Sequence, residues 1–230
     1  GHVIRGELPE GYASTPAERE RMAFAFVDTL AALHAVDQDA VGLGDYGRPA
    51  GFMERQVRRW TGQWNASRSH DVPEIDELAR RLARSVPAQQ RSTIAHGDFR
   101  TDNVVYDAGD PRRINAVLDW ELSTLGDPLT DVGLLMLFWR SADESQLSLI
   151  PGITHLPGFP ERDVMLERYA AASGADLSDM GFYRAFAHFK FAVIAQGVQA
   201  RAAAGAMGGQ DFGNLDDEIL ELAQVGLQHI

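Results

Sequence analysis

Apolar residues recur at intervals of three and four along most of this chain, and that spacing predicts a mainly helical protein. The clearest helix start combines Thr15, Pro16 and Glu18, because a capping box with proline at the first helical position favours a helix. The spacing predicts helices over 16–35, 52–64, 73–86, 128–139, 161–173, 178–204 and 214–229. Three polar side chains are expected to cap later helices: Asp71, Asp127 and Asn214.

A period of two replaces the helical spacing in the middle of the chain. The run Val-Val-Tyr at 104–106 precedes the turn sequence Ala-Gly-Asp-Pro at 108–111, and alternating residues follow over 114–118. These features predict a hairpin from Asn103 to Asp119, which places both residues at one end of a two-stranded ribbon. The sequence therefore predicts an α+β fold that is mostly helical and carries a small β-hairpin.

The residues around this hairpin have the spacing that phosphoryl transfer requires. His96, Gly97 and Asp98 are followed five residues later by Asn103, and Asp119 ends the second strand. Phosphoryl transfer needs a carboxylate beside the acceptor hydroxyl and metal ions at the phosphate oxygens, and Mg²⁺ prefers oxygen ligands. The Asp-to-Asn spacing equals that of the protein-kinase catalytic loop, with glycine replacing its arginine. Each residue alone fits an ordinary turn, but together they indicate a kinase-like site.

The motifs HGDFRTDN, VLDWE and GDPLTD resemble those of the aminoglycoside phosphotransferase/choline-kinase superfamily. The segment LDWELSTLGDPLTD is similar to a subgroup that includes the kinase-like N-terminal domains of some acyl-CoA dehydrogenase proteins. The resemblance runs from about Thr15 to the C-terminus. It implies a protein-kinase-like C-terminal lobe whose hairpin carries the catalytic and metal-binding loop, with ATP and Mg²⁺ as cofactors.

The resemblance assigns expected roles to individual residues. His96 is expected to support the catalytic loop through hydrogen bonds, Glu121 to orient the metal site through water, and Asp131 to brace the loop. Arg100 is expected to steer the charge of the phosphate or substrate. The predicted site comprises Asp98, His96 and Arg100 for catalysis, Asn103 and Asp119 for the nucleotide, and Asn103, Asp119 and Glu121 for the metal.

The same resemblance implies a second lobe that this sequence lacks. No glycine-rich loop after a strand and no Val-Ala-Ile-Lys-like strand precedes Thr15. We therefore expect residues 1–14 to be a hinge remnant and residues 15–230 to be the C-terminal lobe, on which a nucleotide-binding lobe normally packs. The expected function is transfer of the ATP γ-phosphoryl group to a hydroxyl of a small molecule. A hydroxy-acyl or hydroxy-acid acceptor is favoured over an aminoglycoside, and this chain alone is expected to be inactive.

Two other functions remain open at this stage. A non-catalytic nucleotide-binding module, or pseudokinase, would bind ATP without turnover. A metal-dependent phosphoesterase could use the His-Gly-Asp sequence and later aspartates, but it would need further histidine ligands.

Composition restricts the partners and the compartment. The 230 residues carry a formal net charge of −12, which argues against a nucleic-acid partner. That charge can favour a cationic substrate, or it can serve solubility alone. No apolar run is long enough to predict a membrane span. The chain has no cysteine, which excludes disulfides and thiolate sites and is compatible with a cytoplasmic protein.

Two groups of polar residues can each be interpreted in two ways from the sequence. The arginines of 52–64 form either a solvated face or an anion-binding edge: Arg55, Arg58 and Arg59. Three polar residues interrupt the long apolar helix, and each can face an acceptor pocket or pair within the core: His188, Lys190 and Gln196. The resemblance implies that 141–160 also shapes that pocket. His34 is expected to be structural, and residues 205–213 are expected to form a flexible link.

Overall fold

The computed structural model describes residues 1–206 and 213–230. Within them the helices are α1 (Pro16–His34), α2 (Phe52–Ser67), α3 (Pro73–Arg84), α4 (Leu129–Phe138), α5 (Arg162–Ser173), α6 (Met180–Ala203) and α7 (Asp216–Gln228). The strands are β1 (Thr93–Ala95), β2 (Val104–Tyr106), β3 (Ile114–Val117) and β4 (Thr124–Gly126). Positions 207–212 of the predicted flexible link lie outside the described residues.

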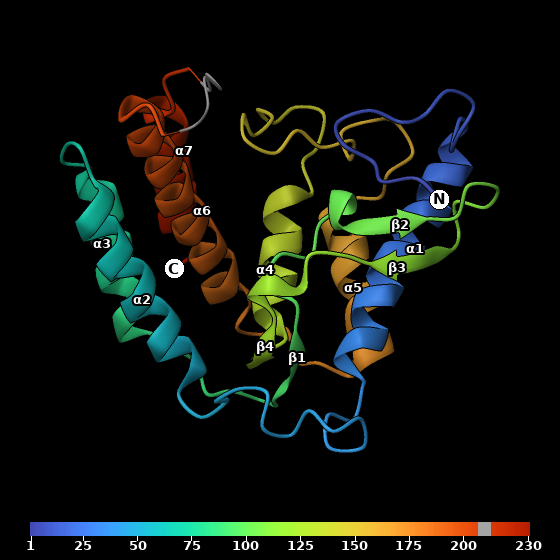
Figure 1. The fold of residues 1–230 in the computed structure, drawn as a ribbon, viewed down its shortest axis with the longest axis horizontal. Helices are drawn as coiled ribbons and strands as arrows, with labels where there is room; N and C mark the ends of the chain where they lie inside the picture. The colour runs from blue at the N-terminus through green and yellow to red at the C-terminus, as the bar shows by residue number, and fades with distance from the viewer. Residues whose placement is uncertain (207–212) are drawn as a thin grey trace.

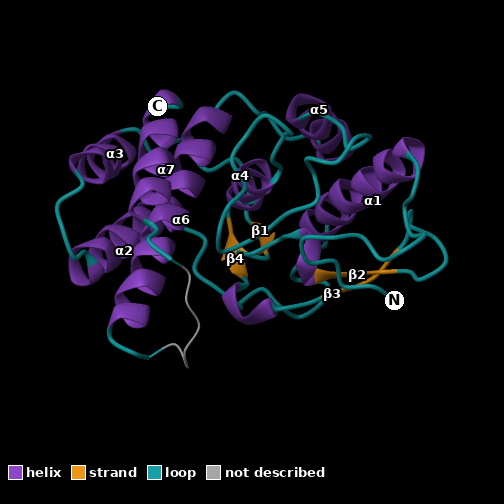
Figure 2. Ribbon diagram, turned by 90° about the horizontal axis from the view of Figure 1, so that it is seen from above, coloured by secondary structure: helices purple, strands orange, loops and turns teal. Residues whose placement is uncertain are grey.

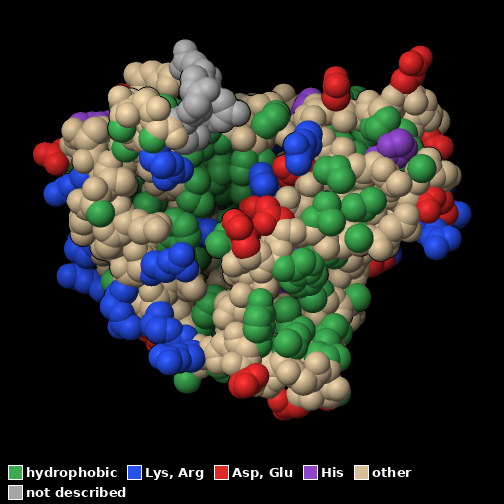
Figure 3. Space-filling model, viewed as in Figure 1, with side chains coloured by type: hydrophobic (Ala, Val, Ile, Leu, Met, Phe, Trp, Pro, Cys, Tyr) green, Lys and Arg blue, Asp and Glu red, His purple; other side chains and the backbone are tan. Residues whose placement is uncertain are grey.

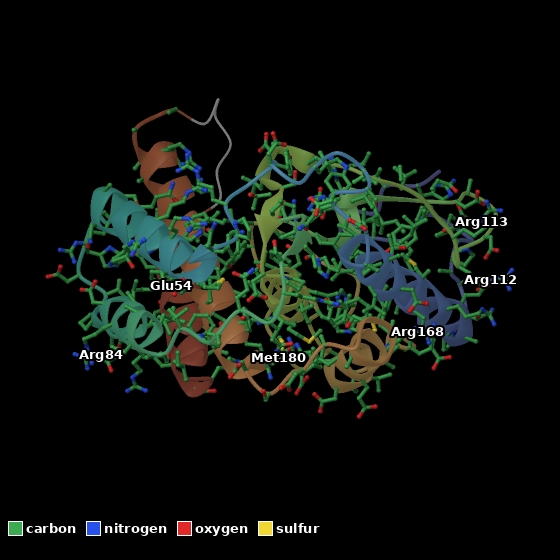
Figure 4. All side chains as sticks on the ribbon, turned by 90° about the horizontal axis from the view of Figure 1, so that it is seen from below. Glu54, Arg84, Arg112, Arg113, Arg168 and Met180 are labelled. Atoms are coloured by element: carbon green, nitrogen blue, oxygen red, sulfur yellow. The ribbon has the colours of Figure 1, made fainter. Side chains whose placement is uncertain are left out.

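Two groups of helices flank the strands (Figures 1 and 2). On one side α6 packs against α7, α4 and α2, and α3 packs against α6 and α7. On the other side α1 packs against α5. Arg168 of α5 reinforces this second pair through two hydrogen bonds of 2.7 Å to the Asp28 carboxylate of α1 (Figure 4). The predicted α+β, mostly helical architecture is confirmed.

The predicted start of α1 is confirmed. The Glu18 backbone N–H donates to Thr15 Oγ1 at 3.3 Å, and the Thr15 backbone N–H donates to Glu18 Oε2 at 2.9 Å. This capping box satisfies two backbone donors that a helix start leaves free. The helix buries a stripe of apolar side chains that includes Met22, Phe26 and Leu30.

The other expected caps are only partly right. Asp71 does not cap α3 and lies instead 3.8 Å from Arg68. Pro73 restricts the residue before it to extended backbone, and this places Val72 at the cap position. Asp127 and Asn214 do accept backbone hydrogen bonds, at 3.0 and 2.9 Å, although α4 and α7 begin slightly later than predicted.

The predicted hairpin is present. Strands β2 and β3 are antiparallel and pair Val104 with Val117. The Leu118 backbone N–H then donates to the Asn103 carbonyl at 2.7 Å, so the ribbon ends between Asn103 and Asp119 as expected. Arg112, in the turn that joins the strands, lies at the outer edge of the molecule (Figure 4).

A second ribbon was not predicted. Strand β4 pairs antiparallel with β1, and Ala95 lies opposite Thr124. This pairing leads the chain from β1 directly into His96 and from β4 directly into Asp127. The segment between β1 and β4, which contains the predicted site, is therefore fixed at both ends.

The first residues pack on the hairpin. His2 exchanges backbone hydrogen bonds of 2.8 and 2.9 Å with Tyr106, and the Tyr12 hydroxyl donates to the Asp107 carbonyl at 2.8 Å. The side chain of Ile4 is buried in the main core. Among the described helices, none combines the length and the apolar character needed to cross a membrane.

Candidate phosphotransfer site

The predicted catalytic loop lies between β1 and β2, and both carboxylate oxygens of Asp98 have a partner within it. The Asn103 side-chain amide donates to the Asp98 carbonyl at 2.8 Å and to Asp98 Oδ2 at 3.0 Å. Arg100 Nε forms an ion pair with Asp98 Oδ1 at 3.1 Å. The structure thus brings together three of the predicted residues, and it orients the Asp98 carboxylate without removing it from solvent.

His96 is a structural residue of this loop. Its Nε2 lies 2.8 Å from the Leu118 carbonyl and its Nδ1 lies 3.3 Å from the Asp98 backbone N–H. These partners require a neutral ring that donates from Nε2 and accepts at Nδ1. The ring is fully buried and packs against Trp120, with centroids 4.9 Å apart. This geometry agrees with the expected supporting role.

Gly97 explains why the loop lacks the arginine of protein kinases. Its backbone has a φ of +83°, a conformation that side chains disfavour. A Cβ atom at this position would lie 2.7 Å from the Leu122 carbonyl oxygen. The close approach of the loop to 120–122 therefore requires glycine.

A buried carboxylate anchors the same loop. Asp131, in the first turn of α4, accepts hydrogen bonds from the backbone N–H groups of His96 at 2.6 Å and Gly97 at 2.7 Å. His34 Nε2 lies 3.1 Å from Asp131, and Tyr169 bonds the other ring nitrogen at 2.8 Å. Burial raises the pKa of Asp131, but the bonds from His34 and the two backbone groups outweigh it and lower that pKa. Both expectations, a structural His34 and a bracing Asp131, agree with these contacts.

Asp119 stands at the open end of the hairpin. It is one of two non-glycine residues with positive φ in the described chain, at +62°. Its side chain is exposed and has no hydrogen-bond or ion-pair partner among the described residues. Backbone strain at a non-glycine residue concentrates at functional sites. Glu121 is also exposed, on the single 3-10 turn that follows, and no described residue pairs with it.

The donor atoms at this end of the hairpin are suited to magnesium. The Asn103 nitrogen is used on Asp98, so its amide oxygen is the atom that can reach a metal. Asp119 adds an unpaired carboxylate, and Mg²⁺ commonly takes one or two carboxylates together with substrate phosphates. Across residues 1–206 and 213–230, no group of three or more His, Cys, Asp or Glu residues could hold a metal. The described residues therefore offer no cluster of the kind that the phosphoesterase alternative would use.

Sequence reasoning did not identify the α6 residue that bonds the backbone of this loop. The Lys190 ammonium, on α6, donates to the Gly97 carbonyl at 2.8 Å. The other two residues that were expected either to face a pocket or to pair in the core are bonded elsewhere: His188 with the Arg184 carbonyl, and Gln196 with Ser67 and Ser69. The sequence indicated Lys190 only as one of three polar residues on the long apolar helix. It could not indicate the contact with Gly97, because 93 residues separate the two.

A sequence model of the phosphotransferase enzyme family matches residues 2–186. The chain belongs to this family. It is 37% identical over 222 residues to acyl-CoA dehydrogenase family member 11 of Rattus norvegicus, which covers 93% of the chain and 28% of that protein. The human protein of the same name is 35% identical over 231 residues, covering 99% of the chain and 29% of that protein. The chain thus spans less than a third of the length of these curated relatives.

Solved structures show the same fold for this phosphotransferase-family chain. A Ralstonia eutropha protein assigned to the aminoglycoside phosphotransferases superposes with a TM-score of 0.87 at 33% identity, covering 100% of the chain and 70% of that protein. LicA in complex with AMP superposes with a TM-score of 0.54 at 17% identity, covering 90% of the chain and 62% of that protein. The predicted superfamily, subgroup and protein-kinase-like fold are confirmed.

Proposed function

We propose that the full-length protein is a Mg-ATP-dependent phosphotransferase that acts on a hydroxyl of a small molecule, and that this chain is its catalytic lobe. One observation carries the proposal. Asp98 and Asn103 are hydrogen-bonded within one loop, and the carboxylate of Asp119, which no described residue pairs with, lies at the adjoining end of the hairpin. The family match and the AMP found in LicA support a nucleotide as the phosphoryl donor.

Each residue has a role in this proposal. Magnesium and ATP, when bound, supply the phosphoryl group and neutralise its charge. Asn103 and Asp119 would hold the metal, with Glu121 orienting the site. The Asp98 carboxylate would accept a hydrogen bond from the acceptor hydroxyl and take its proton as the hydroxyl oxygen bonds to the γ-phosphorus, the bond from that phosphorus to the bridging oxygen breaks, and ADP leaves. Arg100, paired with Asp98 at 3.1 Å, places a positive charge beside the transferred group.

The acceptor we favour is a hydroxy-acyl or hydroxy-acid compound. The curated relatives are named acyl-CoA dehydrogenases, so the kinase-like part of those proteins is joined to an enzyme of acyl compounds. An aminoglycoside, the substrate in the name of some structural neighbours, is the less favoured acceptor.

A nucleotide-binding lobe outside this chain is part of the proposal. The Ralstonia eutropha structure is longer than the region it shares with this chain. We infer that the additional lobe packs on residues 15–230, that residues 1–14 belong to the hinge, and that the 230-residue chain alone does not turn over ATP. A cytoplasmic location, where ATP and Mg²⁺ are available, belongs to the same proposal.

Phosphoryl transfer in the full-length protein tests the proposal. The protein would be incubated with Mg²⁺ and γ-labelled ATP and a panel of hydroxy acids, hydroxyacyl thioesters and aminoglycosides. Labelled product from a hydroxy compound, lost in Asp98→Asn and retained in Asp110→Asn, supports it. Asp110 is a matched control because it pairs with Arg112 in the hairpin turn. Magnesium-dependent ATP binding without transfer to any acceptor would favour the pseudokinase alternative.

A further inference from the structure

Lys190 is a buried cation with unused hydrogen-bonding capacity. It is 9% exposed, and its ammonium group makes one hydrogen bond among the described residues, to the Gly97 carbonyl. An ammonium group carries three donors, so two remain for a ligand or water. Burial lowers the pKa of Lys190, and the nearby carboxylates of Asp98 and Asp131 oppose that effect. A buried charge of this kind is stabilised by an additional anionic partner.

The Lys190 ammonium borders a small cavity between α2, α6 and the catalytic loop. The cavity volume is about 50 Å³, and its lining includes Gln56, Arg59, Trp60, Gly97 and Lys190. A buried water needs about 10–15 Å³ by such a measure, so the cavity holds roughly three to five water-sized groups. That space suits a carboxylate with one or two carbons and is too small for an aminosugar ring. The space-filling view shows that this face of the molecule is hollowed, with hydrophobic side chains inside the hollow and both basic and acidic side chains at its edge (Figure 3).

The charged side chains that line the cavity are both positive. The Arg59 guanidinium and the Lys190 ammonium both lie over the Trp60 ring, 5.6 and 5.5 Å from its centroid. No acidic residue is among the lining side chains that the structure describes. The two other arginines of α2 do not line the cavity, since Arg55 bonds the carbonyls of Arg48 and Ala50, and Arg58, which is exposed as Arg59 is, lies outside the lining. Of the predicted anion-binding edge, Arg59 alone reaches the cavity.

This cavity reaches Gly97, the residue before the proposed catalytic base. Lys190 bonds the carbonyl of Gly97, and the next residue is Asp98. A carboxylate bound by Lys190 would therefore place a hydroxyl a few bonds away close to Asp98. The lining comes from α2, β1, the Gly97 loop, the turn at 120–122, α4 and α6. Residues 141–160 line other cavities, one of which borders Arg100.

We propose that the cavity lined by Arg59, Trp60 and Lys190 is an anion-binding subsite that receives the carboxylate of a small hydroxy-acid acceptor. The inference rests on the proposed function and specifies its acceptor. A cationic acceptor, which the net charge of the whole chain could favour, is disfavoured at this position.

Ligand binding without ATP tests the subsite. Saturation-transfer NMR on the full-length protein would compare 3-hydroxybutyrate with its uncharged analogue 3-hydroxybutyramide. A charge-assisted hydrogen bond contributes enough to change affinity by at least about tenfold. We expect the acid to bind at least about tenfold more tightly than the amide. Lys190→Met should remove that preference while keeping the buried stem, and Lys190→Arg should restore part of it.

Matched variants keep the test specific. Arg58→Gln changes the neighbouring exposed arginine and should leave binding unaltered, whereas Arg59→Gln should weaken it. Circular dichroism would confirm that each variant is folded. If Lys190→Met does not fold, Arg59→Gln tests the subsite in its place. Four results would overturn the subsite. The acid and the amide could bind equally, or neither probe could bind. Binding could be unchanged in Lys190→Met and Arg59→Gln, or Arg58→Gln could lose as much binding as they do.

The subsite and the proposed function fail separately. Asp98→Asn should still show the preference for the acid over the amide, because Arg59 and Lys190, which line the cavity, are unchanged. Acid binding without phosphoryl transfer by the wild-type protein would contradict the proposed function and leave the subsite supported. Phosphoryl transfer to uncharged or cationic hydroxy compounds alone would contradict the subsite and leave the proposed function supported.

Discussion

Asp131 accepts a hydrogen bond of 2.7 Å from the backbone N–H of Gly97 across 34 residues of sequence. Its other oxygen accepts from the His96 backbone at 2.6 Å, so one carboxylate on α4 fixes two consecutive peptides of the catalytic loop. The next residue is Asp98. The position of the proposed base therefore depends on a side chain that is completely buried and cannot touch the substrate.

Replacing Asp131 by Asn should destabilise the protein. The amide offers one acceptor where the carboxylate offers two, and it leaves His34 and a backbone N–H incompletely paired. Losing one partner of a buried network of this kind costs about 2–4 kcal/mol. The lowered pKa of Asp131 means that this stabilisation is complete above its unfolded pKa and is lost as pH falls through the folded pKa.

Urea denaturation at neutral pH checks this prediction. Asp163→Asn, which removes a carboxylate in the first turn of α5, is the matched control. An Asp131→Asn midpoint no lower than that of the control would show that the buried carboxylate contributes nothing to the loop.

Gly97→Ala should distort the loop. A methyl group there would meet the Leu122 carbonyl oxygen at 2.7 Å, and the φ of +83° is strained for alanine. The expected loss of stability is about 1–3 kcal/mol, with a loss of phosphoryl transfer. Gly109→Ala in the hairpin turn is the control, since the nearest atom to an added Cβ lies 3.7 Å away. Thermal unfolding that is the same for both variants would refute the steric argument.

Asp98→Asn should reduce kcat in the full-length protein by about 10²–10⁴-fold, the usual contribution of a general base. Binding of Mg-ATP should persist, because Asn103 and Asp119 are unchanged. If kcat falls by less than about tenfold, another group must accept the hydroxyl proton.

Acid should destabilise the packing of α6 and α7 through His188. Burial lowers the pKa of His188 to about 4, against the bond to the Arg184 carbonyl. The unfolded chain then binds a proton from about pH 6.5 downward while the folded chain does not, so stability falls between about pH 6.5 and 4. This single group can account for roughly 3 kcal/mol of that fall.

Urea midpoints measured across this pH range test the role of His188. His188→Gln should flatten the dependence, and His70→Gln, at an exposed position, should not. Burial lowers the pKa of His229 to about 4 as well, and its ring lies 5.4 Å from that of His188, so the double variant should be flatter still. An unchanged slope in both the single and the double variant would contradict the prediction.

Local patterns predicted much of this fold. The capping box at Thr15 and the alternation over 114–118 depend on neighbouring residues, and both predicted elements are present. Strand β4 was missed because three residues, Thr-Leu-Gly, are too few to show a period. The cap at Asp71 was wrong because the proline two residues later fixes the helix start.

The candidate site, like the fold, was predicted where it depends on neighbouring residues and missed where it depends on tertiary contacts. The spacing from His96 to Asn103 identified the loop, but it could not indicate the left-handed backbone of Asp119 or the Leu122 carbonyl facing Gly97. The bond from Lys190 joins residues 93 positions apart, and only tertiary packing reveals such a contact. The contacts of Gly97 with Lys190 and with the Leu122 carbonyl were therefore left open by sequence reasoning.

Calorimetric titration of the full-length protein with ATP, with and without Mg²⁺, tests the central claim most directly. The claim is that the hairpin end forms a metal-nucleotide site through Asp119. We predict magnesium-dependent binding that is lost in Asp119→Asn and retained in Asp110→Asn. Binding that is independent of magnesium, unaffected by Asp119→Asn or absent altogether would contradict the account.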